Sequence, residues 1–460
     1  MKIHFIGICG VAMGGLALAL KKTGHDVTGS DKGFFPPIST YLKNEGVNYY
    51  PGWHPNKMCA HGDPDLVVVG NVAASTNPEW MYVQEHKIPY VSYPELIEKF
   101  FLKQHSIVCA GTYGKTSSSA LMTQILSDAG YDPSYMFGGL SIDDMPSAYI
   151  GKSEWSVFGG DEYKTARWDN SPKFAHYNPT HLLLTAVEWD HADIYPTEQK
   201  YFDTFETLVR SLPETGLLVL SERAQGYGSY SACKLVTYGL SDQSDYIYSD
   251  IIQTKDGMTL TITHHHESFS ISTPFVSEYQ AENITGCFAL AHSIGINPNS
   301  IIQSIAHHNG LKRRMEKRYE GKMTVIDDIA HSPTKASSAL STVKKITTGK
   351  VIAIFEPNTG NRQASAADGY AHAFSDADMV IIPRLTVIKT DKNSDKPLDG
   401  TELTKIIEQT HPHVRYIDDD QQLIQTIINE TKPGDSVVFL GSHGFRGMIE
   451  EVVSKISSKL

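Results

Sequence analysis

The chain has 460 residues, of which 40% are hydrophobic and 20% are charged. This length exceeds what one hydrophobic core supports, so we expect several domains. The 52 acidic residues outnumber the 40 basic ones, and the net charge of −12 argues against a nucleic-acid partner. Five scattered cysteines without pairing or metal spacing are typical of a reduced, cytoplasmic protein. No apolar run reaches membrane-spanning length, so we expect no membrane partner.

The first predicted unit is a βαβ motif at the N-terminus. An apolar strand over 2–6 runs into the glycine turn 7–15, a helix continues to Lys22, and a second strand over 26–29 is closed by Ser30-Asp31. Such a turn binds the phosphates of a nucleotide, and the acid after the second strand can bind a hydroxyl group. Cys9 stands where the dinucleotide fingerprint has its second glycine, so a nicotinamide dehydrogenase is the least favoured interpretation.

A second polar segment follows the predicted buried strand over 66–70. Asn77 lies beyond the carboxyl end of this strand, which is the edge where open α/β sheets bind ligands. Asn77-Pro78 is also a typical helix start, with the amide as N-cap and proline in the first turn. Both interpretations can hold together.

The strongest motif is a phosphate loop. An apolar run over 106–110 leads into Gly-Thr-Tyr-Gly-Lys-Thr at 111–116, and a helical pattern follows over 117–129. Glycines let backbone N–H groups face phosphate oxygens, the lysine reaches the β- and γ-phosphates, and the Thr116 hydroxyl suits Mg²⁺. Cys109 stands where the standard spacing has its first glycine, so an ordinary turn between strand and helix is the alternative.

Acidic residues close the next two predicted strands. The strand over 154–158 leads into Gly159-Gly160-Asp161-Glu162, and the strand over 181–187 leads into Glu188 and Asp190-His191. Parallel strands bring such groups to one edge of the sheet, where they can hold Mg²⁺ near phosphates. A single histidine is more often structural, so the ligand role of His191 depends on the phosphate loop.

The rest of the chain predicts a hairpin and a second doubly wound sheet. Strands over 246–254 and 258–264 flank Asp256-Gly257, and the histidines at 264–266 are expected to be solvated. A helix over 278–295 carries Asn283 near its start. Further buried strands are expected over 323–326, 350–355, 378–383 and 436–441, the first followed by a helix to Lys345. The predicted domains are 1–104, 105–313 and 314–460.

Taken in order, these motifs resemble the Mur ligase family of ATP-dependent amide ligases. The resemblance rests on the N-terminal glycine turn, Ala-Gly-Thr-x-Gly-Lys-Thr, Asp161-Glu162, Asp190-His191, Arg313-Arg314 and Asp-Asp-x-Ala-His-x-Pro at 327–333. It implies an α/β, three-domain fold: a Rossmann-like domain for a UDP-sugar, a central ATPase domain with a parallel sheet plus a small antiparallel sheet, and a Rossmann-like acceptor domain.

The resemblance also implies the reaction. Gly29–Asp31 is most similar to the members that use UDP-N-acetylmuramate. The branch that joins this sugar nucleotide to the tripeptide L-Ala-γ-D-Glu-meso-diaminopimelate, with ATP and Mg²⁺, is resembled by Asp161-Glu162-Tyr163, Lys173-Phe174, His176-Tyr177, Pro179 and the segment 189–194. Free L-alanine or another acceptor is the alternative within the family. A scaffold that binds a nucleotide or a UDP-sugar without turnover is the alternative of another class.

Site residues follow from positions that match the family. The expected catalytic residues are Lys115 and His191, and the expected metal ligands are Thr116, His191 and Glu162. The nucleotide-binding positions are Gly111, Thr112, Gly114, Lys115, Thr116, Asn283, Arg314, Asp328 and His331. The UDP-sugar-binding positions are Gly7, Cys9, Gly10, Met13, Gly14, Ser30, Asp31 and Asn77.

Several positions depart from the family pattern. Gly159 replaces a glutamate that binds Mg²⁺, and a glycine offers no side-chain ligand. Tyr113 stands in the phosphate loop where this branch usually has histidine, and Thr185 and Ala186 replace asparagines. We expect Asp161 or Glu162 to supply the missing carboxylate, or the metal site to be weakened.

Overall fold

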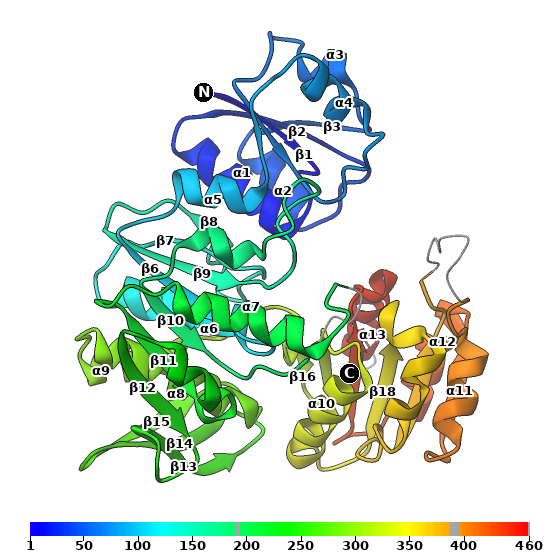
Figure 1. Ribbon diagram of the computed structural model, residues 1–460. Coiled ribbons are helices and arrows are strands. Elements are labelled where there is room, and N and C mark those ends of the chain that lie inside the picture. The colour runs from blue at the N-terminus through cyan, green and yellow to red at the C-terminus, as the bar shows by residue number, and fades with distance from the viewer. Residues whose placement is uncertain (190–193, 387–395, 459–460) are drawn as a thin grey trace. The chain divides into compact units, whose positions relative to one another are not determined.

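The computed structural model describes residues 1–189, 194–386 and 396–458 (Figure 1). The chain forms two compact units. The first comprises Met1–Ile251, Thr259–Pro274 and Tyr279–Gly310, and the second comprises Ile252–Met258, Phe275–Glu278 and Leu311–Leu460. No helix in the described ranges is both long enough and apolar enough to cross a bilayer.

The first unit begins with a five-stranded parallel sheet of order β3-β2-β1-β4-β5. Its elements are β1 (Lys2–Ile6), α1 (Val11–Lys22), β2 (Asp26–Asp31), α2 (Ile38–Asn44), β3 (Asn48–Pro51), α3 (Pro55–Met58), β4 (Leu66–Val69), α4 (Pro78–Glu85), β5 (Tyr90–Val91) and α5 (Tyr93–Phe100). Because β1 lies between β2 and β4, the turn after β1 opens at the switch point where such sheets bind ligands.

A ten-stranded sheet forms the rest of the first unit, in the order β15-β14-β13-β12-β11-β10-β6-β9-β7-β8. Its strands are β6 (His105–Ala110), β7 (Ser134–Met136), β8 (Ala148–Tyr149), β9 (Trp155–Gly160), β10 (His181–Leu184), β11 (Leu217–Ser221), β12 (Lys234–Gly239), β13 (Tyr246–Gln253), β14 (Met258–His264) and β15 (Glu267–Thr273). The predicted hairpin is present, and its strands extend the edge of this sheet.

Helices and short 3₁₀ segments accompany this sheet. They are α6 (Lys115–Asp128), η1 (Lys173–Tyr177), α7 (Glu198–Arg210), η2 (Glu222–Tyr230), α8 (Tyr279–Ser293) and α9 (Pro298–His307). Strand β6 pairs in parallel with β10 and with β9, so the loop after β6 lies at the centre of the sheet's carboxyl edge. The sheet therefore places the phosphate loop between the ends of β9 and β10.

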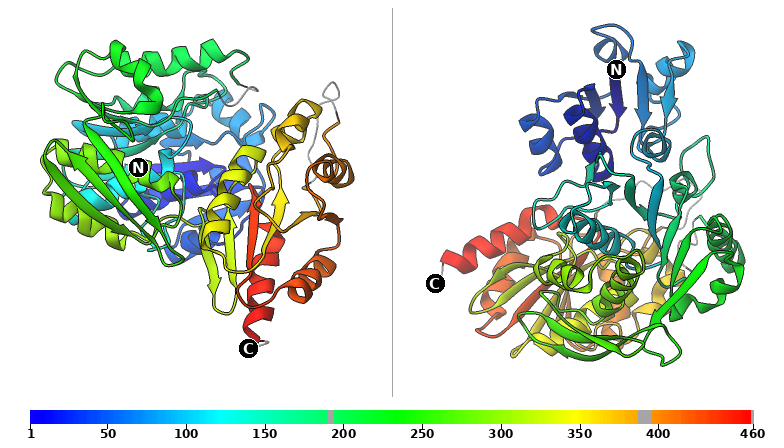
Figure 2. Two further views of the ribbon diagram at one scale, coloured as in Figure 1. Left: turned by 90° about the horizontal axis from the view of Figure 1, so that it is seen from below. Right: turned by 90° about the vertical axis from the view of Figure 1, so that its left-hand side faces the viewer.

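The second unit is built on a six-stranded sheet of order β16-β17-β21-β18-β19-β20, parallel except for β16. Its elements run from yellow-green to red in Figure 2. Its strands are β16 (Glu316–Glu320), β17 (Thr324–Asp328), β18 (Val351–Glu356), β19 (Met379–Pro383), β20 (Val414–Ile417) and β21 (Ser436–Gly441). Its helices and 3₁₀ segments are α10 (Pro333–Ile346), η3 (Gly360–Arg362), η4 (Ala364–Tyr370), α11 (Gly400–Glu408), α12 (Asp420–Glu430), η5 (Phe445–Gly447) and α13 (Met448–Ser458).

Alternation along β18 divides the core of the second unit into two layers. Ala353 and Phe355 pack with α10 and α11, whereas Ile352 and Ile354 pack with α12 and α13. Successive strand residues point to opposite faces, and both faces are covered, so the strand is apolar throughout. Polar groups therefore gather where the strands end, as the sequence predicted.

Among the element boundaries that differ from the prediction, two bear on the phosphate loop. Strand β10 ends at Leu184 instead of continuing to Val187, because Thr185 leaves the strand to hydrogen-bond the phosphate loop. Helix α6 begins at Lys115, two residues earlier than predicted, after Gly114 with a positive φ of 79°. Both differences bring backbone and side-chain groups onto the loop.

Candidate functional site

The phosphate loop has the backbone of an anion cradle. Gly111 and Gly114 have φ angles of 127° and 79°, a region that L side chains rarely adopt. A Cβ atom on Gly111 would lie 2.9 Å from the Ala186 carbonyl oxygen, and one on Gly114 would clash with the Asn283 side-chain oxygen. Two predicted nucleotide positions, Gly114 and Asn283, are thus in contact although they lie far apart in the sequence.

The residues after β10 fasten this loop. The Thr185 hydroxyl donates toward the Tyr113 carbonyl oxygen at 2.6 Å, and the Thr112 amide donates to the Ala186 carbonyl oxygen at 2.7 Å. The Thr112 hydroxyl lies 2.8 Å from the carbonyl oxygen of Glu188. Thr112 therefore ties the loop to the segment that follows β10.

Lys115 and Glu162 form the central ion pair of the site. The Lys115 ammonium lies 2.8 Å from one Glu162 carboxylate oxygen and 3.1 Å from the other, and the carboxylate is fully buried. Lys115 is the first residue of α6, and Glu162 lies just beyond β9. This brings together the predicted phosphate-binding lysine and the predicted replacement metal acid.

Glu162 is also held through its backbone. Its carbonyl oxygen accepts a hydrogen bond of 2.5 Å from the Tyr195 hydroxyl. The neighbouring Asp161 pairs instead with Lys173, at 2.5 Å. Of the two acids considered for the missing carboxylate, Glu162 is therefore the one that faces the phosphate loop.

Thr116 and Glu162 offer oxygen ligands of the kind that Mg²⁺ prefers, alongside waters and substrate phosphates. Gly159 adds no ligand, and a Cβ atom there would lie 3.3 Å from the Ser119 hydroxyl. His191 lies outside the described residues, and its roles as catalytic residue and metal ligand stay predictions. Within 1–189, 194–386 and 396–458, no group of three or more His, Cys, Asp or Glu side chains is placed to hold a metal. The donor set fits a metal held largely by substrate and water.

Sequence reasoning missed a charged cluster beside the loop. The Arg223 guanidinium lies 5.8 Å from the centre of the Tyr113 ring and pairs with Glu188 and Glu282. The pKa of Arg223 is raised; burial opposes this rise, and the two carboxylates cause it. No motif marks Arg223, because η2 brings it to the site from a segment without polar periodicity.

The N-terminal turn is closed by residues at the end of β2. The Ser30 carbonyl oxygen accepts hydrogen bonds from the amides of Gly7 and Ile8, at 2.8 and 3.1 Å. The Asp31 carboxylate accepts a bond of 2.9 Å from the Cys9 amide. Asp31 thus caps the turn that the sequence assigned to phosphates, and Ser30 contributes its backbone.

The other predicted positions of this turn differ in their surroundings. A Cβ atom on Gly14 would lie 2.5 Å from the Ile38 side chain, so Gly14 allows α1 to pack against α2. A Cβ atom on Gly10, by contrast, would have no neighbouring atom within 4 Å. Met13 is buried beside Gly70. The space beside Gly10 is therefore open, whereas Gly14 and Met13 are packed.

A buried carboxylate organises the floor of this turn. Glu79 is fully buried and accepts hydrogen bonds from the Ser30 hydroxyl (2.5 Å), the Tyr50 hydroxyl (2.6 Å) and the His54 amide (2.8 Å). Burial favours a higher pKa for Glu79, but His4 at 3.6 Å and the Ser30 and Tyr50 hydroxyls outweigh it, so the pKa of Glu79 is lowered. The Ser30 side chain is therefore committed to Glu79.

Asn77 behaves as the predicted N-cap. Its side-chain oxygen accepts from the amides of Glu79 and Trp80, at 3.0 and 3.1 Å, and Pro78 occupies the first turn of α4. Its side-chain nitrogen is buried and hydrogen-bonds to no group in the part of the chain that the structure describes. The helix-start interpretation is confirmed, and the ligand interpretation stays a prediction.

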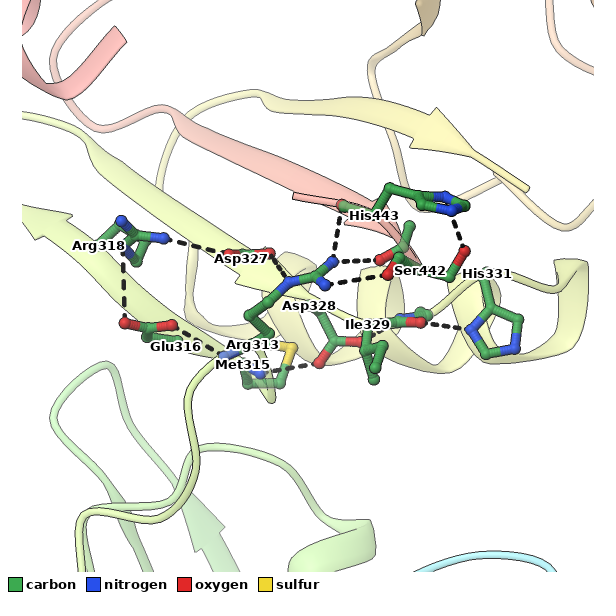
Figure 3. A network of polar contacts seen from close by, with 12 residues as sticks. Arg313, Met315, Glu316, Arg318, Asp327, Asp328, Ile329, His331, Ser442 and His443 are labelled. Carbon is green, nitrogen blue, oxygen red and sulfur yellow. Dashed lines mark hydrogen bonds and ion pairs between the residues drawn. The ribbon is translucent and has the colours of Figure 1, made fainter. Parts of the chain in front are cut away.

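In the second unit, Arg313 and Asp328 anchor the start of the sheet (Figure 3). The Arg313 guanidinium donates to the carbonyl oxygens of Gly441, Ser442 and His443, at 2.5, 3.0 and 2.9 Å. It also pairs with the buried Asp327 at 3.3 Å. The Arg313 guanidinium therefore holds the loop after β21, while Arg314 is its partly exposed neighbour in the predicted nucleotide site.

Asp328 and His331 lie together after β17 (Figure 3). The Asp328 carboxylate accepts 2.8 Å hydrogen bonds from the amides of Met315 and Ala330, and burial raises its pKa. The His331 ring nitrogen Nδ1 lies 2.6 Å from the Ile329 carbonyl oxygen. Asp328 therefore holds the backbone of Met315 and Ala330 in place. Its contact with a nucleotide stays a prediction.

A further charged cluster at this sheet edge escaped the sequence analysis. Arg446, with a φ of 54°, makes a two-pronged ion pair with Asp420 and lies 3.6 Å from the buried Glu356. Glu356 ends β18 and accepts bonds from the amide and hydroxyl of Thr386. The carboxyl edge of the second sheet therefore presents both signs of charge.

Comparison with known families covers most of the chain. Residues 2–105 match the model described as Mur ligase family, catalytic domain, residues 167–291 match the Mur ligase middle domain, and residues 313–443 match the Mur ligase, glutamate ligase domain.

Comparison with individual proteins gives full-length similarities. The chain is 29% identical to UDP-N-acetylmuramate--L-alanyl-gamma-D-glutamyl-meso-2,6-diaminoheptandioate ligase of Escherichia coli K12, over 100% of this chain and 99% of that protein. It is 28% identical to UDP-N-acetylmuramate--L-alanine ligase of Rhodospirillum rubrum, over 96% and 92%.

Solved structures extend the likeness to three dimensions. A murein peptide ligase from Psychrobacter arcticus has a TM-score of 0.73 at 26% identity, covering 99% of this chain and 98% of that one. A UDP-N-acetylmuramate-alanine ligase from Thermotoga maritima has a TM-score of 0.82 at 21% identity and covers both chains fully, which bears on the fold alone.

Proposed function

Because this chain belongs to the Mur ligase family, we propose that it joins UDP-N-acetylmuramate to the tripeptide L-Ala-γ-D-Glu-meso-diaminopimelate. Members of the family are ATP-dependent ligases that form amide bonds, and so is this chain. The tripeptide is supported by the Escherichia coli relative, whose name contains these substrates and which aligns along the whole chain.

The proposed reaction has two steps. A carboxylate oxygen of the muramyl group attacks the γ-phosphorus of ATP, the bond to the β-phosphate oxygen breaks, and ADP leaves. The amine of the tripeptide then attacks the acyl carbon, phosphate leaves with the carbon–oxygen electron pair, and the amine loses a proton. Such transfers depend on charge neutralisation and on in-line positioning of the reactants.

The observation that carries the proposal is the arrangement around Lys115. The lysine begins α6 behind a left-handed glycine, Asn283 packs on that glycine, and Glu162 holds the ammonium at 2.8 Å. A positive charge at a helix N-terminus suits the transferring phosphoryl group. We assign Lys115 to the γ-phosphate and Asn283 to the nucleotide.

Thr116 and Glu162 are the described residues that would hold Mg²⁺, which neutralises phosphate charge when it is bound. Glu162 would bind the metal in place of the family glutamate that is replaced here by Gly159. The N-terminal turn, with Gly10 open, is the proposed site for the UDP-sugar phosphates. A cytoplasmic location is part of the proposal, and the five free cysteines support it.

A second acceptor, free L-alanine, is favoured by the 28% identity with the Rhodospirillum rubrum ligase. Gly159 favours a third possibility, a scaffold that binds nucleotide or UDP-sugar without turnover. The three differ in what they do with an acceptor, so one experiment separates them.

The test is phosphate release with ATP, Mg²⁺ and UDP-N-acetylmuramate, in parallel reactions with the tripeptide, with L-alanine or with no acceptor. The expected result is release that depends on the tripeptide, together with a product of the ligated mass. Release with L-alanine alone would move the assignment to the second acceptor. Binding of both nucleotides without release under any condition would establish the scaffold.

A further inference from the structure

The segment between β9 and β10, residues 161–177, touches both candidate ligand sites of the first unit. Its first residues include Glu162, which pairs with Lys115 of the phosphate loop. Its middle residues, Arg167 and Trp168, contact the N-terminal sheet. Neither Arg167 nor Trp168 belongs to a motif or a predicted site.

Arg167 holds the loop that follows β4. Its guanidinium donates two hydrogen bonds to the carbonyl oxygen of Ala73, from Nε at 3.3 Å and from Nη2 at 3.0 Å. Ala73 is buried, and its amide donates to the Gly70 carbonyl oxygen at 3.0 Å. The arginine therefore fixes a backbone atom four residues before Asn77, in the loop assigned to the UDP-sugar.

Trp168 packs on the helix that follows that loop. Its ring stacks on Trp80 with centroids 5.2 Å apart and an interplanar angle of 22°, and it meets the Tyr90 ring edge-on at 5.0 Å. Trp80 and Tyr90 are themselves in edge contact at 4.7 Å. Trp80 is the neighbour of Glu79, the buried carboxylate that fixes Ser30, so the indole contact reaches the floor of the N-terminal turn.

The two ends of the segment are also tied down. Lys173 pairs with Asp161, which keeps the first and last parts of the segment together. His176 lies 2.9 Å from the Asp169 carboxylate and 3.0 Å from that of Glu98 on α5. The segment therefore has contacts at Ala73 and Trp80 on one side and at Lys115 on the other.

We propose that Arg167 and Trp168 are positioning residues that couple occupancy of the N-terminal UDP-sugar site to nucleotide affinity at the phosphate loop. The inference rests on the two ligand sites of the proposed function, but not on turnover. A ligand that orders the 71–77 loop orders the 161–177 segment through Arg167 and Trp168, and with it the Glu162 carboxylate beside Lys115. Coupling of this kind is reciprocal: each ligand tightens the binding of the other by the same factor.

The experiment measures the Kd of UDP-N-acetylmuramate for the full chain by titration calorimetry, with and without saturating AMP-PNP and Mg²⁺. For the wild type we expect Kd to fall at least about 5-fold when the nucleotide analogue is present. In Trp168→Ala and in Arg167→Met the ratio should shrink to within about 2-fold of one, while binding of each ligand alone changes little.

Two variants serve as controls. Trp168→Phe keeps an aromatic ring against Trp80 and should retain the coupling. Arg210→Met removes a guanidinium that pairs with Glu206 on the outer face of α7, and it should leave the ratio at the wild-type value. If the two residues had only a structural role, their variants would bind each ligand alone more weakly, and the ratio of the Kd values without and with AMP-PNP would stay unchanged.

The outcomes separate this inference from the proposed function. Equal Kd values with and without AMP-PNP in the wild type, or full coupling in both Trp168→Ala and Arg167→Met, would overturn it. A wild type that binds both ligands cooperatively but forms no ligated product would refute the ligase and support the coupling. Failure of the wild type to bind the UDP-sugar would refute both.

Discussion

Lys115 and Glu162 face each other across the carboxyl edge of the central sheet, with the ammonium 2.8 Å from a carboxylate that has no solvent exposure. The pair joins the first residue of α6 to the residue that follows the end of β9 by two positions. It fixes the lysine in the place where a γ-phosphate is proposed to bind, and it neutralises a carboxylate that burial would otherwise disfavour.

Lys115→Met should lower kcat/KM for ligation by about 10³-fold, because the charge on the transferring phosphoryl group loses its partner. It also leaves Glu162 buried without its cation, so we expect a loss of about 1–3 kcal/mol in the free energy of unfolding. Denaturant unfolding measures this loss. The double variant Lys115→Met/Glu162→Gln should recover stability but not activity. Recovery of activity would contradict the catalytic role.

Gly114→Ala should strongly lower the affinity for AMP-PNP. The new Cβ must fit a φ of 79° and a position already filled by the Asn283 side chain, and small displacements at such a site cost about 100-fold in activity. Gly130→Ala is the matched control, since Gly130 has a φ of 87° with nothing within 4 Å. The control should show the backbone strain alone, with unchanged affinity for AMP-PNP. Equal affinities in the two variants would refute the steric argument.

Glu79→Ala should destabilise the N-terminal sheet, because three donors from Ser30, Tyr50 and His54 lose their acceptor. Of the three donor residues only Ser30 is fully buried, and a buried donor left unpaired costs about 1–3 kcal/mol. Because the Ser30 carbonyl closes the glycine turn, the KM for the UDP-sugar should rise more than the KM for ATP. Glu85→Ala, an exposed residue at the end of the same helix, should change neither the unfolding free energy nor either KM.

Stability should depend on pH through His176. Its pKa is raised above the ordinary value of 6.5; burial opposes the rise, and Glu98 and Asp169 cause it. The contribution of His176 to the free energy of unfolding is therefore complete below pH 6.5. It is lost as the pH rises through the higher pKa of the folded state. The difference in Tm between wild type and His176→Gln should shrink between pH 6 and about 8. A difference in Tm that stays constant over that range would show that His176 is not a source of the pH dependence of stability.

His181 should show the opposite dependence. Burial lowers its pKa to about 4, so the folded chain keeps it neutral while the unfolded chain binds a proton below pH 6.5. Its contribution is present above pH 6.5 and is lost as the pH falls from there toward 4. The Tm of the wild type and of His181→Gln, measured from pH 7 down to pH 5, checks the sign. The Tm of the wild type should fall further than that of the variant.

Arg313→Ala should loosen the loop after β21. The variant frees three consecutive carbonyl groups and leaves the buried Asp327 paired with Arg318 alone. We expect faster amide hydrogen exchange over residues 441–447, with the exchange of β18 little changed. Arg415→Ala, which removes an exposed partner of Glu430, is the control and should leave the loop protected.

Much of the fold could be predicted from the chain because its strands are short apolar runs that end in polar groups. The strand over Lys2–Ile6 and the cap at Asn77 were predicted as they stand, since both depend on local chemistry. The end of β10 was not, because Thr185 leaves the strand for hydrogen bonds with the phosphate loop, a contact between distant segments.

The site shows the same division. The order of the glycines and Lys115 in the sequence predicts the phosphate loop. The ion pairs of Arg223 with Glu188 and Glu282 depend on where η2 and α8 lie in the fold, and sequence periodicity does not predict that placement. The sequence predicts a nucleotide contact for Arg314 and gives Arg313 no role of its own. Only the folded sheet shows that the Arg313 guanidinium is engaged by three carbonyl groups and a buried acid.

The contact of α8 with the phosphate loop has a consequence for synthesis. The Cys287 thiol donates to the Ser118 carbonyl oxygen at 3.5 Å, a bond that spans 169 positions, and Asn283 packs on Gly114 from the same helix. On the ribosome, the N-terminal sheet can form while that helix has yet to be made. In the nascent chain the phosphate loop therefore lacks its contacts with α8 until that helix has been synthesised.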